Sequence, residues 1–329
     1  MKPAGGGFAG ALLRRLTEPD YPLLAVEVRP RALGIVRVQR QRRRLELGAA
    51  VVQELPEGCI VPSLSEVNIA APEAFQAALR AGLERAGAAG ASRACLVLPD
   101  PAGRVALVPA ADLAGKRAKD AAELIRFRLR KSLSFDVREA RLAYHPLSAG
   151  EAVGGSIPVV AVARAVLEQY EAALAAAGLY AGLVELAGLV CQAAAVHGRP
   201  LDEDRVIVNW DDGYVSLLIT RAGRLAVVRT LTLPADPVAA AADVQREVFN
   251  TLLYYRERLG GQGLAGATLR SAARPPDEAA ALLAEALELV PEPLAPWSLL
   301  PHGAPSGPRA YDVPAGLAST LAAVLGRAA

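Results

Sequence analysis

The stretch RVIVNWDDGYVSLLITRAGRLAVVRTLTL, residues 205–233, decides the fold. Its three β-rich runs are separated by tight turns, which predicts three antiparallel strands, and a long helix is expected to follow from about Ala239 to Leu259. Residues 23–52 repeat this plan with LLAVEV, ALGIVRV and LELGAAVV, and an amphipathic helix then begins at Pro72. The chain is therefore predicted to contain two copies of one α/β unit.

A smaller α/β pattern interrupts the first unit. Residues 104–163 predict a strand, the helix AAELIRFRLRKSL and two further strands, which indicates an inserted subdomain. We divide the chain into an N-terminal segment (1–21), a first-lobe core (22–102), the insertion (103–164), a return to the first lobe (165–200), a second lobe (201–312) and a C-terminal helix (313–329).

The composition indicates a globular protein of about two domains and argues against several classes of site. Of the 329 residues, 53% are apolar and 21% charged, and the net charge of +2 gives no overall attraction to nucleic acid or anionic lipid. The three cysteines and three histidines form no CxxC pair or cluster. We therefore expect no metal site, and buried thiols in a reducing cytoplasm.

Neither the N-terminus nor any internal stretch predicts membrane insertion. Two arginines interrupt the apolar part of residues 1–16, which does not fit a signal peptide. The nearest candidate span is 179–196, but Glu185 at its centre would cost about 3 kcal/mol on insertion. This stretch is expected to form two elements of a soluble fold, with Glu185 as a structural carboxylate at a strand end rather than a catalytic one.

Four stretches carry a resemblance to a known family: EGCIVPSLSEVN (57–68), AAELIRFRLRKSLSFDVREARLAYHPL (121–147), LEQYEAALAAAGLYAGLVELAGLVCQAA (167–194) and DVQREVFNTLLYYRERLGG (243–261). In order and spacing they resemble the PilM family of type IV pilus assembly, and the cytoplasmic domain of the type II secretion L protein is similar. The resemblance spans about residues 22–326. It implies an α/β, actin-like (ASKHA) fold of two lobes with duplicated βββαβα cores and a small α/β insertion in the first lobe.

The first phosphate-binding turn that the resemblance implies is altered. The family pattern is like D-I-G-S, whose Asp orders a magnesium-bound water and whose Gly and Ser contact phosphate. The matching residues are Glu27, Val28, Arg29 and Pro30. Arg29 replaces the glycine that allows close approach, and Pro30 has no backbone N–H to donate.

The second phosphate turn and the adenosine motif are altered as well. Asn209 stands at the first acidic position of the second turn, and Asp211 brings a negative charge to the place of a glycine. The matching positions are Asn209, Asp211, Asp212 and Gly213 in the turn, and Ser271, Ala272 and Ala273 in place of the glycine pair. These changes predict a pseudo-ATPase with no catalytic residue and no cofactor. The alternative is an active ATPase or kinase of the same fold, which would need ATP and Mg²⁺.

Arg29 suggests what replaces the nucleotide. The two phosphate turns of this fold face each other across the cleft, so Arg29 in one lobe is expected near Asp211 and Asp212 in the other. A guanidinium can bridge carboxylates with two-pronged geometry, which predicts an ion pair that clasps the lobes. The alternative is that Arg29 points into solvent.

The resemblance also implies a partner. The PilM family receives a short apolar peptide between the first lobe and its insertion, and the matching helix here spans 123–133. The protein-binding candidates are Ile125, Phe127, Arg128, Leu129 and Leu133. The expected partner is the N-terminal cytoplasmic segment of a single-span, PilN-like inner-membrane protein, with the assembly motor ATPase as a second contact. The protein would then lie in the cytoplasm at the inner membrane. Alternatively, the apolar stripe only packs on the insertion's own sheet.

Two other features have less specific interpretations. The basic run Arg37–Arg44 could be a nucleic-acid or lipid patch, but it lacks interleaved aromatic residues, so a solvated hairpin tip is favoured and no nucleic-acid partner is expected. Tyr254 and Tyr255 on the long second-lobe helix are expected in the core.

Overall fold

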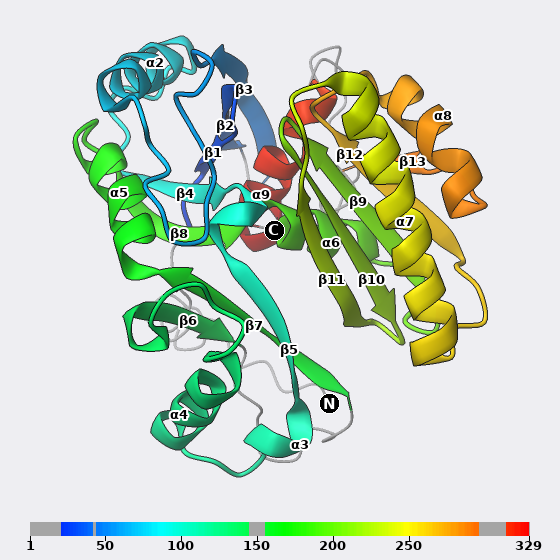
Figure 1. Ribbon diagram of the computed structural model, residues 1–329. Coiled ribbons are helices and arrows are strands. Elements are labelled where there is room, and N and C mark those ends of the chain that lie inside the picture. The colour runs from blue at the N-terminus through cyan, green and yellow to red at the C-terminus, as the bar shows by residue number, and fades with distance from the viewer. Residues whose placement is uncertain (1–20, 42–43, 145–154, 296–313, 329) are drawn as a thin grey trace, which may run out of the picture.

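The structure is a computed structural model that describes residues 21–41, 44–144, 155–295 and 314–328, and two five-stranded sheets dominate it (Figure 1). The first sheet has the order β3-β2-β1-β4-β8. Strands β1, β2 and β3 are antiparallel, whereas β4 and β8 run parallel to β1. Its strands are β1 (Leu24–Val28), β2 (Ala32–Gln41), β3 (Arg44–Glu54), β4 (Arg93–Leu98) and β8 (Tyr180–Leu186).

The second sheet repeats this topology, with the order β11-β10-β9-β12-β13. Again the first three strands along the chain are antiparallel and the next two run parallel to the first of them. Its strands are β9 (Arg205–Asp211), β10 (Tyr214–Arg221), β11 (Arg224–Thr232), β12 (Gly266–Ser271) and β13 (Glu292–Pro293). The predicted duplication is therefore confirmed at the level of strand order and direction.

Helices pack on both faces of each sheet. Helices α2 (Pro72–Arg85) and α5 (Arg164–Ala175) cover the outer face of the first sheet, and α7 (Pro237–Leu259) and α8 (Pro276–Leu287) cover the outer face of the second. Between the sheets lie α6 (Ala187–Val196) and α9 (Ala318–Ala328), whose apolar side chains contact both lobes (Figure 1). The C-terminal helix is thus part of the interface between the lobes.

The ends of α7 show why this helix has its observed length. The Asp236 side chain accepts a hydrogen bond from the Ala239 backbone N–H at 2.7 Å, and Gly260 ends the helix in the left-handed conformation, with φ of 64°. Pro237 occupies the first turn, where its missing N–H is not needed. Its start lies two residues before the predicted one.

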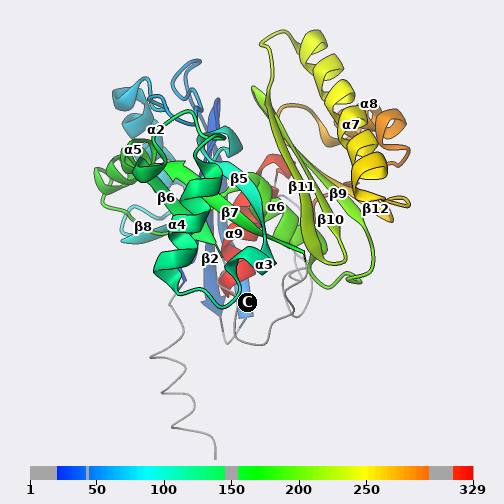
Figure 2. The same ribbon diagram turned by 60° about the horizontal axis from the view of Figure 1, so that its bottom comes forward.

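The insertion lies between β4 and α5 and has its own sheet and core. Strands β5 (Arg104–Pro109), β7 (Ser156–Ala163) and β6 (Ala140–Tyr144) form an antiparallel sheet in that order. Helix α4 (Ala118–Leu129) packs on it through Ala121, Ile125 and Leu129. A short helix, α3 (Ala110–Leu113), precedes α4. Figure 2 shows α4 on the outside of the insertion.

Several expectations need correction. Tyr255 is buried as predicted, but Tyr254 is 40% exposed and stacks beneath the Arg229 guanidinium at 5.2 Å, so it is not a core residue. Helices α3 and α8 were not anticipated; α3 has only four residues, whereas α8 carries the regular spacing Ala279, Leu283 and Leu287, which could have identified it. Residues 179–196 form β8 and α6, as expected, with Glu185 half-buried in β8. Among the described residues, no helix is long and apolar enough to cross a membrane.

Candidate functional site

Arg29 of the first lobe extends its side chain to the second lobe. The residue follows β1, and its Nε donates a hydrogen bond to Asp211 Oδ1 at 3.1 Å. Its Nη2 donates to the Ala272 carbonyl oxygen at 3.3 Å and lies 3.8 Å from Asp212 Oδ2. The predicted ion pair between the lobes is therefore present. Because Arg29 and Asp211 are both buried, solvent screens this pair little.

Arg270 lies at the centre of the same interface, although the sequence did not identify it. It is the penultimate residue of β12 and is fully buried. Its Nη2 donates to Glu27 Oε1 at 2.8 Å and to the Gly316 carbonyl at 2.9 Å, and its Nη1 donates to Asn209 Oδ1 at 3.0 Å and to Asp211 Oδ2. This one guanidinium therefore bonds to β1, to β9 and to the segment that leads into α9.

Glu27 connects the central helix α9 to this guanidinium. Its Oε1 accepts from Arg270, while its Oε2 accepts hydrogen bonds from the Ser319 hydroxyl at 2.6 Å and from the Thr320 hydroxyl. Gly34 on β2 makes the close approach of α9 possible, since a Cβ atom there would lie 2.6 Å from Thr320 Oγ1. The carboxylate is thereby bonded on both oxygens without contact with water.

Asp100 extends the buried polar cluster into the first lobe. The residue begins a short 3-10 helix after β4, and its Oδ1 accepts a hydrogen bond from the Gly188 backbone N–H at 2.7 Å. Its Oδ2 accepts from Asn209 Nδ2 at 2.9 Å. Asn209 therefore bridges Asp100 and Arg270, using its amide as donor on one side and its carbonyl as acceptor on the other. This use fixes the orientation of the Asn209 amide.

The carboxyl groups in the cleft have different proton affinities. Burial raises the pKa of Asp100, and hydrogen bonds from Ser216, Gly188 and Asn209 only partly oppose this. Burial acts in the same direction on Asp211, but the charges of Arg270 and Arg29 outweigh it and hold its pKa below the ordinary value. Asp211 is therefore the carboxylate that the two guanidinium groups keep ionised.

The Asp212 carboxyl behaves in the opposite way to its neighbour. Burial and the negative charge of Asp211 raise its pKa, and Arg29 opposes this only in part. Its backbone N–H donates to Asp211 Oδ1 at 2.8 Å. The pKa values of these adjacent carboxyl groups therefore shift in opposite directions, because Asp211 lies between two guanidinium groups whereas Asp212 lies beside the charge of Asp211.

The remaining residues predicted around the nucleotide motifs line the same interface but do not form a phosphate cradle. Gly213 turns the chain from β9 to β10 with φ of 76° and is exposed. The Ser271 hydroxyl donates to the Arg274 carbonyl at 2.7 Å, and the Ala272 N–H donates to the Trp210 carbonyl at 2.9 Å. Pro30 and Ala273 are half-buried beside them.

The oxygen atoms that a hard cation would use here already accept hydrogen bonds from protein groups. Glu27 and Asp211 each bind Arg270, and Asp211 also binds Arg29. The Arg29 Nη1 atom lies so close to Gly316 that a Cβ there would be only 3.1 Å away. In this conformation the Glu27 and Asp211 oxygens all accept hydrogen bonds from protein groups, which leaves no free carboxylate oxygen on these two residues for a magnesium nucleotide.

The five protein-binding candidates on and after α4 differ in their exposure to solvent. Ile125 and Leu129 are buried in the insertion's own core, and Leu133 is half-buried against it. Ile125 and Leu129 therefore pack on the sheet of the insertion, as the alternative expected, and the role of the other candidates as partner contacts stays a prediction. Phe127 and Arg128 are exposed, and Arg128 forms an ion pair with Asp112.

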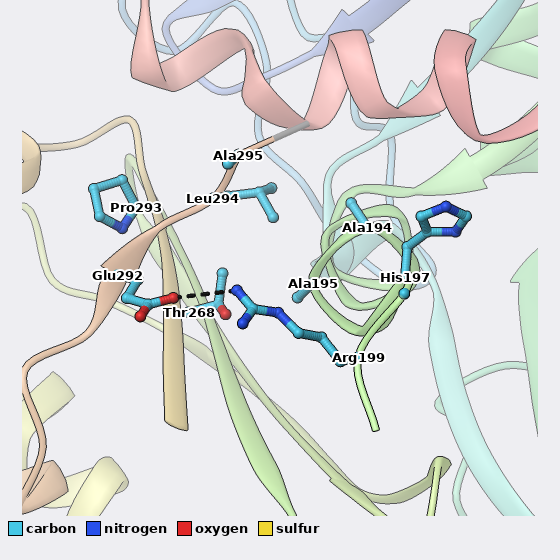
Figure 3. Close-up of a pocket in the computed structure, with 10 residues that line it drawn as sticks. Ala194, Ala195, His197, Arg199, Thr268, Glu292, Pro293, Leu294 and Ala295 are labelled. Atoms are coloured by element: carbon cyan, nitrogen blue, oxygen red, sulfur yellow. Dashed lines mark hydrogen bonds and ion pairs between the residues drawn. The ribbon is translucent and has the colours of Figure 1, made fainter. Parts of the chain in front are cut away.

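A separate hollow of about 540 Å³ lies beside the end of α6 (Figure 3). It is lined by the end of α6 together with β12 and β13, and Arg199 reaches toward Glu292 across it at 3.4 Å. Both side chains are largely exposed, so this pair is a weak surface bridge. We assign no ligand to this hollow.

No protein-family model and no curated protein matches the sequence. Among solved structures, the fold is similar to a chain of a "PilM-PilN type IV pilus biogenesis complex", with a TM-score of 0.75 at 20% identity, over 94% of this chain and 100% of that one. A protein of actin-like ATPase fold from Bacteroides thetaiotaomicron gives a TM-score of 0.49 at 8% identity, over 81% and 88% of the two chains. The cytoplasmic domain of EpsL, an inner-membrane component of the type II secretion system of Vibrio cholerae, gives 0.45 at 13%, over 77% and 83%. The predicted fold, with two lobes, duplicated sheets and a small α/β insertion in the first lobe, is thus confirmed.

Proposed function

We propose that this protein is a PilM-like scaffold of a type IV pilus or type II secretion assembly platform, which holds a membrane partner and does not hydrolyse nucleotide. The observation that carries the proposal is the buried cluster around Arg270, which joins both lobes with protein groups alone. The structural similarity to a chain of a PilM–PilN type IV pilus biogenesis complex supports a role in such an assembly platform.

The filled cleft favours binding over catalysis. An ATPase of this fold needs room for phosphates between its lobes and groups that stabilise charge developing on them. Here Arg29 and Arg270 are each bonded to carboxylates of the cleft, and Pro30 cannot donate a backbone hydrogen bond. A scaffold needs only a fixed lobe arrangement, and the buried ion pairs supply it.

The proposed partner is the N-terminal cytoplasmic segment of a single-span, PilN-like inner-membrane protein, in contact with the assembly motor on another face. We place this segment at the junction between the first lobe and the insertion. There the Ser134 hydroxyl at the end of the α4 region lies 3.2 Å from the Ser65 hydroxyl of the first lobe. Val61 and Val67 on the same first-lobe loop are exposed, which gives an apolar segment a surface to cover.

Val67 provides a direct test of this placement. Its side chain is 63% exposed, so Val67→Asp should leave the fold intact and weaken binding of the partner segment by about tenfold or more, through loss of apolar contact. Val290→Asp in the second lobe is the matched control, since Val290 is 76% exposed.

The measurement is fluorescence anisotropy with a labelled synthetic peptide, whose sequence is the N-terminal cytoplasmic segment of a single-span, PilN-like protein from the same genome. The proposal predicts loss of binding in Val67→Asp and unchanged binding in Val290→Asp. Equal binding by both variants would remove the junction from the partner site, and no binding by the unmodified protein would contradict the scaffold role.

A further inference from the structure

The outer face of α4 presents a single exposed aromatic side chain. Ala121, Ile125 and Leu129 form the buried side of this helix, and Phe127 lies two residues from both of the last two. Two residues correspond to about 200° around a helix, so Phe127 projects directly away from the core. It is 67% exposed, and Figure 2 shows the helix on the outside of the insertion.

Basic side chains surround this phenylalanine. Arg130 and Lys131 directly follow the last residue of α4, and the Arg130 guanidinium lies 5.5 Å from the centre of the Phe127 ring. Lys119 is two helical turns before it. We call Lys119, Phe127, Arg130 and Lys131 the α4 outer face. Within the described residues none of its three basic groups has a carboxylate partner, whereas the other basic residues of α4 do, in the pairs Arg126–Glu123 and Arg128–Asp112.

The charge of this region is local. Residues 116–131 contain seven basic and two acidic residues, a net charge of +5, whereas the whole chain carries only +2. Three of the four lysines in the chain lie in these sixteen positions. The positive charge around α4 is therefore a local feature, and residues 29–44, with seven arginines and no acidic residue, form a second basic stretch.

We propose that the α4 outer face binds the surface of a membrane that contains anionic phospholipid. Basic side chains are attracted to anionic headgroups, and a projecting aromatic ring can enter the headgroup region between them. The proposal rests on the proposed function only in that a membrane partner would place the chain near the bilayer. The interaction itself needs no partner protein.

The shape of the face favours a membrane over an acidic macromolecule. A bound peptide requires a groove, but Phe127 lies on the convex side of a helix. Single-stranded nucleic acid is bound by several aromatic rings along a charged channel, and α4 has one aromatic residue. A flat anionic surface can contact cations at both ends of the helix at once.

The test is co-sedimentation of the full chain with vesicles of phosphatidylcholine, alone or with about one third phosphatidylglycerol. Two pairs of variants separate charge from the aromatic contribution. Arg130→Glu is compared with Arg258→Glu on α7, and Phe127→Ser with Phe249→Ser, where Phe249 is a comparably exposed ring at 59%.

The proposal predicts binding to the anionic vesicles alone, weakened by added salt because screening shortens the reach of the charges. Arg130→Glu and Phe127→Ser should each reduce it about tenfold, while both α7 variants bind normally. Absent or equal binding to the two vesicle types would overturn the proposal, as would equal losses in the α7 variants. Binding to poly-glutamate or an oligonucleotide without binding to vesicles would assign the face to an acidic macromolecule instead. Since no partner is added, none of these results bears on the Val67 test.

Discussion

Arg270 of the second lobe and Glu27 of the first form an ion pair of 2.8 Å in which neither side chain is exposed to solvent. Such a pair is not simply a source of stability, because desolvation of both charges offsets much of their attraction. Removing one partner is nevertheless costly, since the other charge is left buried and uncompensated. The pair therefore makes one arrangement of the two lobes strongly preferred over others.

Replacing Arg270 should be among the most damaging single changes in the chain. Arg270→Met would leave Glu27 and Asp211 without their shared cation, with an expected loss of about 3–5 kcal/mol in the free energy of unfolding. Arg205→Met is the control, because Arg205 is also buried but pairs with Glu203, which is partly exposed. Urea unfolding at neutral pH should give a clearly smaller loss for the control, and equal losses would contradict the central role of Arg270.

The acceptors of Arg270 should bind a metal ion once the guanidinium is removed. In Arg270→Ala, oxygen atoms of Glu27, Asp211, Asn209 and Gly316 would lose their donor, and hard divalent cations favour such oxygen ligands. We expect Mn²⁺ or Mg²⁺ to raise the melting temperature of this variant and to leave that of the unmodified protein unchanged. A metal concentration of 100 times the Kd would add about 2.7 kcal/mol. A variant that melts identically with and without metal would exclude the idea.

Asp211 and Asp212 should affect the pH dependence of stability in opposite directions. The pKa of Asp211 is lowered from 3.8, so its contribution to stability is present above that pH and is lost as the pH falls through the folded-state value. The pKa of Asp212 is raised from 3.8, so its contribution is present below that pH and is lost as the pH rises.

The two asparagine variants measure these contributions separately. Urea unfolding across about pH 3 to 6 should show that Asp211→Asn loses less stability on acidification than the unmodified protein, and that Asp212→Asn loses more. The same sign of change in both variants would show that the two carboxyl groups do not differ as described.

Gly34 should be essential for the docking of α9. In Gly34→Ala the new Cβ would lie 2.6 Å from Thr320 Oγ1 and 2.7 Å from Leu317 Cδ2, which forces the helix to shift. We expect a loss of about 1–3 kcal/mol and faster amide hydrogen exchange in α9. Gly90→Ala is the control, because nothing lies within 4 Å of the new atom. Unchanged exchange in α9 with Gly34→Ala would show that α9 is not held there.

Half of the ionic cluster could be predicted from the sequence. Arg29 and Asp211 occupy positions that the family resemblance places on facing turns, so their charges could be paired from the sequence. The duplicated sheets were predicted from the strand pattern itself, because β-rich runs separated by turns occur twice and are each followed by a helix.

Arg270 could not be predicted in the same way. In GATLRS it is one charged residue near the end of a short strand, a place where arginine usually reaches solvent. The signal that was available is its register beside Asn209 on β9, but strand register needs knowledge of which strands are neighbours. Asp100, Ser319 and Thr320 were missed for the same reason, since their partners lie far away in the sequence.

For the apolar stripe on α4, the sequence predicted the helix face but not what packs against it. A spacing of four residues correctly identified one face of a helix at Ile125 and Leu129, but the pattern does not say whether that face packs on its own sheet or on a partner. Only the packed structure separates these residues from the exposed Phe127.

The central claim is that protein groups replace the nucleotide between the lobes, and calorimetric titration with Mg-ATP tests it most directly. The ion pairs of Arg29 and Arg270 predict no saturable binding to the unmodified protein, and none to Arg29→Gly, because Pro30 and Asn209 remain. Saturable binding with a Kd below about 10 μM, equivalent to roughly 7 kcal/mol, would contradict the account.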